Sequence, residues 1–158
     1  MTTADNRLGI LRGLGWMLNE ELLVLPGVLR ALVLSADGLP VTCSKDIDRN
    51  QEMPSDIAER MAAAVTGLQA VSQESTEFAS TPRRNKEEPF SAGPWQRTLL
   101  QFDKAYITVI SANIGTYLTV AMNDKADVEA VSYTMEKVVD RIGEKLGLPA
   151  RQSAPSAS

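Results

Sequence analysis

The segment from Pro26 to Val41 constrains the fold of this chain more than any other. It reads PGVLRALVLSADGLPV, which is an apolar run, an Asp-Gly pair and a second extended run. Asp-Gly is typical of the tight turn of a β-hairpin, because that turn needs positive backbone φ angles. The segment therefore predicts two antiparallel strands, over residues 29–35 and 39–44, joined at Asp37 and Gly38.

Periodicity predicts the remaining elements. Apolar residues recur at helical spacing over residues 14–25, 55–78 and 126–146, and short extended runs separated by turn residues cover 95–102, 105–112 and 116–122. The short connections among the last three strands predict an antiparallel meander. The chain order is then helix-strand-strand-helix-strand-strand-strand-helix.

This order predicts an α+β domain, an α/β sandwich built on a five-stranded antiparallel sheet. Apolar runs without alternation at residues 31–34 and 106–110 indicate strands covered on both faces, with two helices on one face and one on the other. A lone helix leaves part of its face uncovered, so we expect the strand over 95–102 to be an open edge. The domain should span residues 14–147, between a flexible arm (1–13) and a disordered tail (148–158).

The second helix carries an unusual set of small residues. Its apolar stripe is expected to be Ile57, Met61, Ala64, Leu68 and Val71, and Ala63, Gly67 and Ala70 share a neighbouring face. A glycine inside a helix costs about 1 kcal/mol relative to alanine unless a close contact compensates. Two interpretations stay open: Gly67 clears space for the chain's own sheet, or for a partner helix.

The connection from Ala79 to Gly93 is long for a compact domain. It contains Pro82 and Pro89 and a basic cluster, residues 83–86, that is followed at once by two glutamates. We interpret it as an exposed, solvated loop, with a contact to phosphate or to an acidic partner as the alternative.

Composition excludes several classes of protein. The net charge of −4 argues against a nucleic-acid partner, because affinity for the phosphate backbone needs clustered basic residues. A single Cys43 indicates a reducing compartment, and we interpret it as a small buried hydrophobe. The early apolar stretch is interrupted by Asn19-Glu20-Glu21, so it is not a secretory signal, and no segment has the roughly 18 apolar residues of a membrane span. We expect a cytoplasmic protein.

Candidate chemistry is nearly absent. The chain has no histidine, no phosphate-binding P-loop and no dinucleotide-binding glycine motif, so we expect no catalytic, cofactor-binding or metal-binding residues. Asp46, Asp48 and Glu52 lack the glycine-centred loop of a calcium site. Trp16 and Trp95 are interpreted as core or edge fillers, with stacking on a ligand as the alternative.

The hairpin segment, from PGV at residues 26–28 to ALVLSADGLP at 31–40, resembles the roadblock/dynein-light-chain family. GPWQRT at 93–98 and YTME at 133–136 resemble its actinobacterial branch, encoded beside a sensor kinase and a small Ras-like GTPase. The resemblance covers roughly residues 14–146. Members of the family are not enzymes; they form homodimers that act as platforms or regulators for small GTPases, including GTPase activation in bacterial motility.

The resemblance implies that the second helix packs against its mate and that the first meander strand pairs with its mate. The implied dimer interface contains Ala63, Gly67, Ala70, Trp95, Arg97, Leu99 and Gln101. It also implies that the GTPase docks on the paired-helix side, with contact candidates Asp56, Glu59, Arg60, Ala63 and Gly67. A sensor-kinase-like protein is a further partner that the resemblance allows, with peripheral recruitment to a membrane-associated complex. The rival hypothesis is a small-molecule sensor of the PAS or GAF kind.

Overall fold

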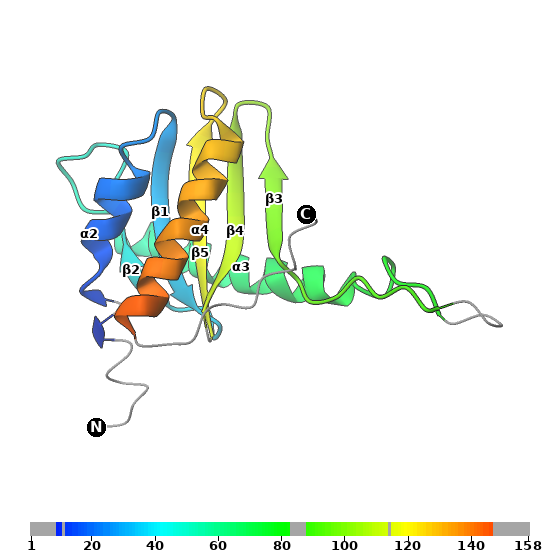
Figure 1. Cartoon of the computed structure of the whole chain (residues 1–158). Coiled ribbons are helices and arrows are strands. Elements are labelled where there is room, and N and C mark those ends of the chain that lie inside the picture. Colours follow the sequence, from blue (N-terminus) through cyan, green and yellow to red (C-terminus); the bar gives the residue numbers. More distant parts are fainter. Residues whose placement is uncertain (1–8, 11, 83–87, 114, 147–158) are drawn as a thin grey trace.

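A computed structural model describes residues 9–10, 12–82, 88–113 and 115–146 (Figure 1). It contains one five-stranded antiparallel sheet in the order β2-β1-β5-β4-β3. The strands are β1 (Val28–Ser35), β2 (Pro40–Cys43), β3 (Arg97–Gln101), β4 (Ala105–Asn113) and β5 (Thr116–Asn123). The helices are α2 (Gly15–Met17), a π-helix η1 (Leu18–Leu22), α3 (Ser55–Glu74) and α4 (Val128–Lys145).

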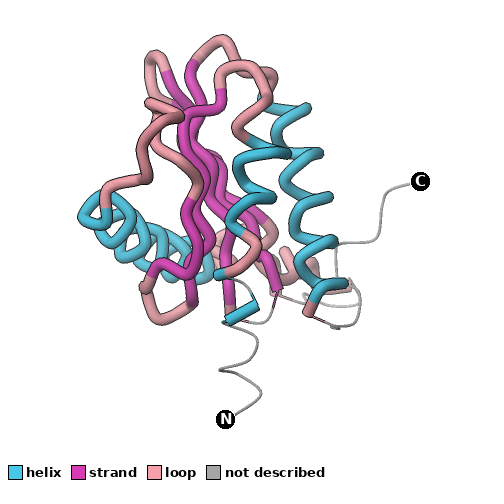
Figure 2. Tube along the Cα trace, turned by 90° about the vertical axis from the view of Figure 1, so that its left-hand side faces the viewer, coloured by secondary structure: helices cyan, strands magenta, loops and turns pink. Residues whose placement is uncertain are grey.

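The helices form two layers around the sheet, as expected from the sequence. Figures 1 and 2 show α2 and α4 on one face and α3 on the other. The larger core cluster fills the first side, where Val33, Ile110 and Leu118 are fully buried. A smaller cluster lies under α3 and includes Leu34, Ala62 and Val65. The predicted α+β class and the chain order of the elements are confirmed.

The Asp-Gly hairpin also forms as predicted. Gly38 has a φ of +88°, which is the left-handed conformation that the turn requires. The Ser35 amide donates to the Leu39 carbonyl at 2.9 Å, and the Gly38 amide donates to the Ser35 carbonyl at 3.0 Å. These bonds close the turn between β1 and β2.

The single helix predicted over residues 14–25 is wrong in detail. The segment is one turn of α-helix followed by a π-turn, in which the Leu23 amide donates to the Leu18 carbonyl at 3.0 Å. A π-turn spaces its bonds five residues apart, so Leu18 and Leu23 come onto the same face. Leu14, Met17, Leu18 and Leu22 are nevertheless buried, as their spacing predicts.

Helix α3 differs from the prediction in two respects. Its buried positions are Ala58, Ala62 and Val65, whereas Val71 is 64% exposed and Ala64 is exposed. The larger apolar residues flank the contact, because small alanines let the helix axis lie close to the sheet. The helix ends at Glu74 rather than near residue 78. The Ser75 amide still donates to the Val71 carbonyl at 3.1 Å, but the Thr76 amide donates to the Gln73 carbonyl at 3.1 Å, so the chain leaves the α-helix through a tighter turn.

Other boundaries move by one or two residues. β3 begins at Arg97 rather than at residue 95, and α4 begins at Val128 rather than at residue 126. The predicted tail, the basic cluster at 83–86 and most of the predicted N-terminal arm lie outside the described residues.

Helix α4 is fixed at its start by a capping aspartate. The Asp127 carboxylate accepts a hydrogen bond from the Ala130 amide at 3.1 Å, which satisfies one of the free amides of the first turn. We therefore expect Asp127→Ala to lower the free energy of unfolding by about 1 kcal/mol in chemical denaturation. Asp124→Ala removes the same charge three residues earlier and is the control. An equal loss in both variants would assign the effect to charge rather than to the cap.

Candidate functional site

Strand β3 forms one edge of the sheet and pairs with β4 alone among the described strands. Cross-strand pairing places Arg97, Leu99 and Gln101 on the α4 face, where Arg97 also lies 3.3 Å from the Glu136 carboxylate of α4. Leu99, at the centre of this edge, is 47% exposed. The predicted open edge is therefore present, with an apolar side chain at its midpoint.

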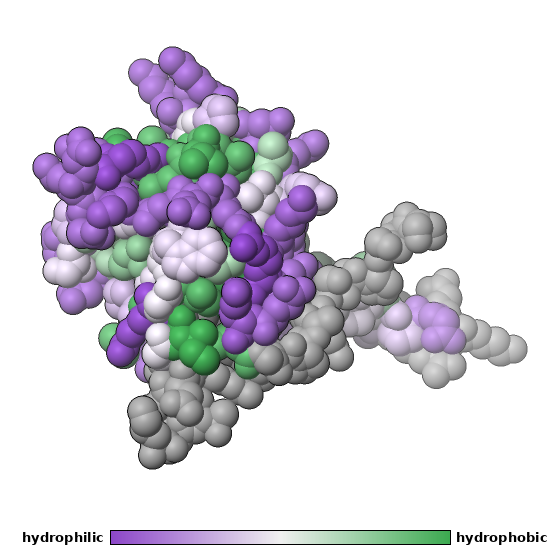
Figure 3. Space-filling view, turned by 60° about the vertical axis from the view of Figure 1, so that its left-hand side comes forward, coloured by the Kyte–Doolittle hydropathy of each residue, from purple (hydrophilic) through white to green (hydrophobic). Residues whose placement is uncertain are grey.

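The opposite edge is poorly suited to pairing. β2 has only four residues, and it begins with Pro40, which has no amide hydrogen to donate. The molecule viewed with its α2 side turned forward shows mainly polar side chains with separate apolar areas between them (Figure 3). β3 is thus the better edge for adding a strand.

Helix α3 crosses the strands and passes beyond the β3 edge (Figure 1). Ser72 marks the crossing point, because its hydroxyl oxygen lies 3.1 Å from that of Thr98 on β3. Beyond Glu74 the chain continues through tight turns into a short hairpin, where the Thr81 amide donates to the Phe90 carbonyl at 2.8 Å. We name the described residues 75–82 and 88–93 the arm. Its Phe78 is 99% exposed.

The small residues of α3 lie away from the chain's own sheet. A Cβ added at Gly67 would have no atom within 4 Å, and Ala63 and Ala70 are exposed. This overturns the interpretation in which Gly67 clears space for the sheet. Ala63 lies instead on the flank of α3 that faces the hairpin turn, where its Cα would lie 3.9 Å from a Cβ built at Gly38.

The proposed GTPase contacts share this outer side of α3. Asp56 and Arg60 form an ion pair at 3.2 Å and are mostly exposed, and Glu59 is exposed beside them. Helical spacing places Asp56, Arg60 and Gly67 on one stripe, with Glu59 and Ala63 on the adjoining flank. The structure therefore brings all five candidates onto one surface.

On the other flank of α3, the sheet is only half covered. One cross-strand row, which we name the covered row, consists of Thr98, Val109, Thr119 and Leu32, and the last three are buried. The next row on the same face lies toward the Gln101 end of β3, and we name it the open row. It consists of Leu100, Ile107, Ala121 and Arg30, all half-buried.

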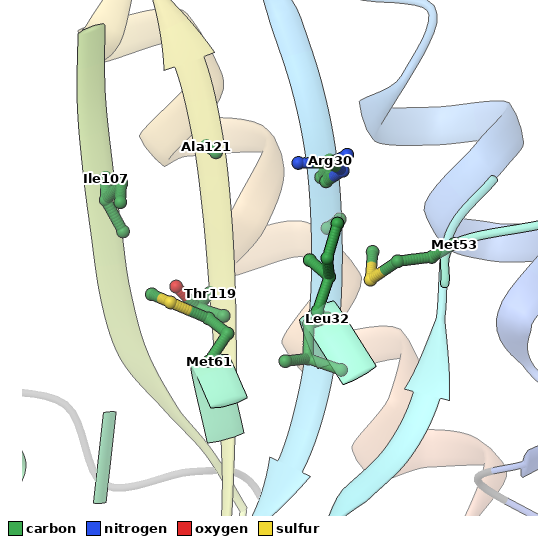
Figure 4. Close-up of a pocket in the computed structure, with 9 residues that line it drawn as sticks. Arg30, Leu32, Met53, Met61, Ile107, Thr119 and Ala121 are labelled. Carbon is green, nitrogen blue, oxygen red and sulfur yellow. The ribbon is translucent and has the colours of Figure 1, made fainter. Parts of the chain in front are cut away.

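An apolar pocket of about 160 Å³ lies between α3 and the open row (Figure 4). Met61 and Ile57 of α3 form one wall, Met53 lies at one end, and Ile107, Ala121 and Thr119 form the floor. The buried Thr119 hydroxyl has no hydrogen-bond partner among the described residues. Apolar atoms form most of the pocket lining.

Arg30 borders the pocket and is held by Asp46. The Arg30 Nε donates to the Asp46 carboxylate at 2.7 Å. This hydrogen bond, together with one from the Ile47 amide, lowers the pKa of Asp46 below its usual value. Asp46 is therefore a structural partner of β1.

Trp95 fills the sheet edge rather than offering a free ring. Its ring packs edge-on against Tyr117 with the centroids 5.7 Å apart, and its Nε1 donates to the Thr98 hydroxyl at 2.8 Å. The filler interpretation is confirmed for Trp95, whereas Trp16 is 44% exposed.

No reaction centre emerges from the geometry of the described residues. Burial raises the pKa of the Cys43 thiol, which disfavours the reactive thiolate. Within the described ranges, no cluster of three or more potential metal ligands is found. None of the helices in those ranges combines the length and apolar character that crossing a membrane requires.

Sequence reasoning missed the pocket, the arm and the ion pair between Arg97 and Glu136. The pocket depends on the crossing angle of α3, which periodicity does not report. The arm had a signal, since Phe78 and Phe90 are apolar residues at the two ends of a charged loop. Nothing in the local sequence pairs Arg97 with Glu136, which lie 39 residues apart.

Comparison with known proteins gives one consistent family. A family model described as Roadblock/LC7 domain matches residues 14–122. No curated protein matches the chain significantly.

Solved structures share the fold. A Roadblock/LC7 domain from Streptomyces avermitilis is 22% identical, covers 84% of this chain and 97% of its own, and superposes with a TM-score of 0.67. The gliding protein MglB from Thermus thermophilus is 15% identical over 93% of each chain, with a TM-score of 0.61. MglB in a tetrameric arrangement is 14% identical, covers 93% of this chain and 92% of its own, and has the same TM-score of 0.61.

Proposed function

The chain belongs to the Roadblock/LC7 domain family, and from this premise we propose that it is a non-catalytic, homodimeric regulator or scaffold for a small Ras-like GTPase. The observation that carries the proposal is the open β3 edge with α3 running past it. The family resemblance supports the GTPase partner and the regulatory role.

The proposed dimer forms by antiparallel pairing of β3 with β3 of a second copy, which continues the sheet across both chains. Leu99 then meets Leu99 of the other copy near the two-fold axis, with Arg97 and Gln101 on either side. The flank of α3 that faces the other copy carries Ala64, Leu68 and Val71, of which Val71 is 64% exposed. Pairing supplies partners for backbone groups that an edge strand otherwise leaves free.

In that dimer the outer stripes of the two α3 helices form one surface. Asp56, Arg60 and Gly67 lie on it, with Glu59 and Ala63 at its border. The resemblance placed Ala63, Gly67 and Ala70 in the dimer interface. In the proposed dimer these exposed residues lie instead on the outer side of α3, and we propose that Ala63 and Gly67 belong to the docking surface, where small side chains let a partner backbone approach closely. The GTPase docks there through its switch regions, and the dimer biases the ordering of those regions without supplying catalytic groups.

The test uses purified small Ras-like GTPases of the source organism, loaded with GTP. It measures the affinity of this protein for each GTPase, and the rate of GTP turnover with and without this protein. A change in turnover or a saturable complex supports the proposal. If none of these GTPases bound the protein or changed its rate of GTP turnover in its presence, the proposal would be refuted.

Gly67→Gln separates stability from binding. Because nothing lies within 4 Å of a Cβ at Gly67, the variant should raise the free energy of unfolding by about 0.5–1 kcal/mol through better helix propensity. The same side chain should obstruct the docking surface and weaken GTPase binding at least tenfold, measured by fluorescence anisotropy. Ala130→Gln, exposed on α4 across the sheet, is the matched control and should leave binding unchanged. If Gly67→Gln bound the GTPase as tightly as the unchanged protein, the docking site would not lie on this surface.

The apolar pocket beside α3 gives little support to the sensor hypothesis. Small-molecule pockets usually measure roughly 300–1,000 Å³. The apolar pocket beside α3 measures about 160 Å³ and is open on one side. It is better suited to a single side chain than to a complete ligand.

A further inference from the structure

We infer that the arm of each copy closes the apolar pocket of the other copy, with Phe78 as the side chain that enters it. The inference rests on the proposed β3 pairing and extends it, because the pocket is then complete only in the dimer. Three features support it: the positions of the covered and open rows along the strands, the distance that the chain extends beyond β3 after Ser72 (the overhang), and the volume of the pocket.

The two rows are matched by a two-fold axis at Leu99. An axis perpendicular to the sheet at that point sets Thr98 of one copy opposite Leu100 of the other. The covered row of the first copy, which includes Thr98, then lies level with the open row of the second, which includes Leu100. α3 keeps to the same face of the continuous sheet, so its overhang runs along the partner's open row.

The overhang has the length that this placement needs. Phe78 is six residues beyond Ser72, which is about 9–12 Å at the rise of an α- or 3₁₀-helix. Strands lie about 4.8 Å apart, so the other copy's β4 and β5 lie about 10 and 14 Å from the β3 crossing point. The Phe78 backbone therefore reaches Ile107 of that copy, and its ring extends toward Ala121.

The pocket fits a phenyl ring. Its volume of about 160 Å³ is close to that of an apolar cavity of about 150 Å³ that holds benzene. Met53 and Met61 line it, and methionine side chains adapt to aromatic groups. In the isolated chain Phe78 is 99% exposed, and burying it would remove a large apolar side chain from water.

The expected loss on truncation is large because each dimer has two such pockets. Phe78→Ala should raise the dimer Kd about tenfold for each pocket, hence about 100-fold in total. Folding of the single chain should not change, since Phe78 is exposed there. Ile47→Ala is the matched control, because Ile47 is 52% exposed and lies outside the β3 edge and the arm. Sedimentation velocity over a concentration series measures both variants.

Cross-linking locates the contact directly. In a Cys43→Ala background, chains carrying Phe78→Cys are mixed with chains carrying Ala121→Cys and treated with a short bismaleimide. Mass spectrometry should find peptides 78 and 121 joined between chains, and Glu144→Cys in place of Ala121→Cys should give no link. Three results would overturn the arm contact but not the dimer: a dimer that gives no link between positions 78 and 121, an unchanged dimer Kd in Phe78→Ala, or a small molecule bound in the pocket. A monomer at high concentration overturns the arm contact and the proposed dimer together.

Discussion

Leu99→Lys is expected to convert the protein into a monomer. Leu99 is the midpoint of β3 and is 47% exposed, so a lysine there stays in solvent and leaves the fold of one chain intact. In the proposed dimer two lysines would face each other across the two-fold axis. Like charges opposite each other destabilise a strand pair, and lysine on an edge strand opposes edge-to-edge association. Light scattering at high concentration should give the mass of one chain, and the dimer Kd should rise by at least 100-fold.

The matched control is Leu39→Lys. Leu39 is 59% exposed and lies at the hairpin turn, near the other edge of the sheet. It receives the same charge without touching β3, so the dimer should persist. If Leu99→Lys stayed dimeric while circular dichroism showed a native fold, pairing through β3 would be excluded.

The fold was predictable wherever local chemistry decides the structure. The Asp37-Gly38 turn needs a positive φ that glycine supplies, and the α4 stripe from Val131 to Ile142 is buried as its spacing requires. Helix α3 was harder to predict. Its contact with the sheet is made by Ala58 and Ala62, so the bulkiest residues, which dominate a periodicity count, lie to one side.

The candidate site was predictable in outline but not in geometry. The edge character of β3 followed from mixed polar and apolar residues, and Gly67 was identified as an exception to helix propensity. What Gly67 faces is a tertiary question, answered only by the open space around it. The pocket likewise depends on the relative placement of α3 and three strands, which no local pattern encodes.

These features favour a protein whose single chain leaves apolar side chains and backbone groups uncovered. The unpaired edge and the exposed Phe78 lie at the β3 end of the sheet, whereas the apolar pocket lies over β4, β5 and β1. Each of the three exposes groups that are more stable when covered. One symmetric association covers all three. The outer stripe of α3, in contrast, contains the ion pair of Asp56 and Arg60 and stays in solvent, available to a different partner.

Gly27→Ala is expected to cause a larger loss of stability than alanine at Gly38, Gly93 or Gly115, the other glycines with a positive φ among the described residues. Gly27 has a φ of +84°, which costs an alanine about 1–2 kcal/mol. An added Cβ would also lie 2.7 Å from the Ala126 amide nitrogen and 2.8 Å from its Cα, and backbone atoms cannot move aside as a flexible side chain can. The Gly27 carbonyl accepts from the Asn123 amide at 2.8 Å, so displacing Gly27 would also disturb the entry to α4.

We expect the free energy of unfolding to fall by about 3–4 kcal/mol and the melting temperature by about 10 °C. Gly38→Ala is the matched control: its φ of +88° carries the same backbone strain, but the nearest atom to its Cβ would be the Thr66 hydroxyl oxygen at 3.4 Å, an ordinary van der Waals contact. Its loss should therefore be only the 1–2 kcal/mol of strain. Both variants are measured by chemical denaturation at one protein concentration, so that dissociation of the proposed dimer would affect both measurements equally. Equal losses in the two variants would show that backbone conformation alone, and not the contact with Ala126, makes glycine necessary at position 27.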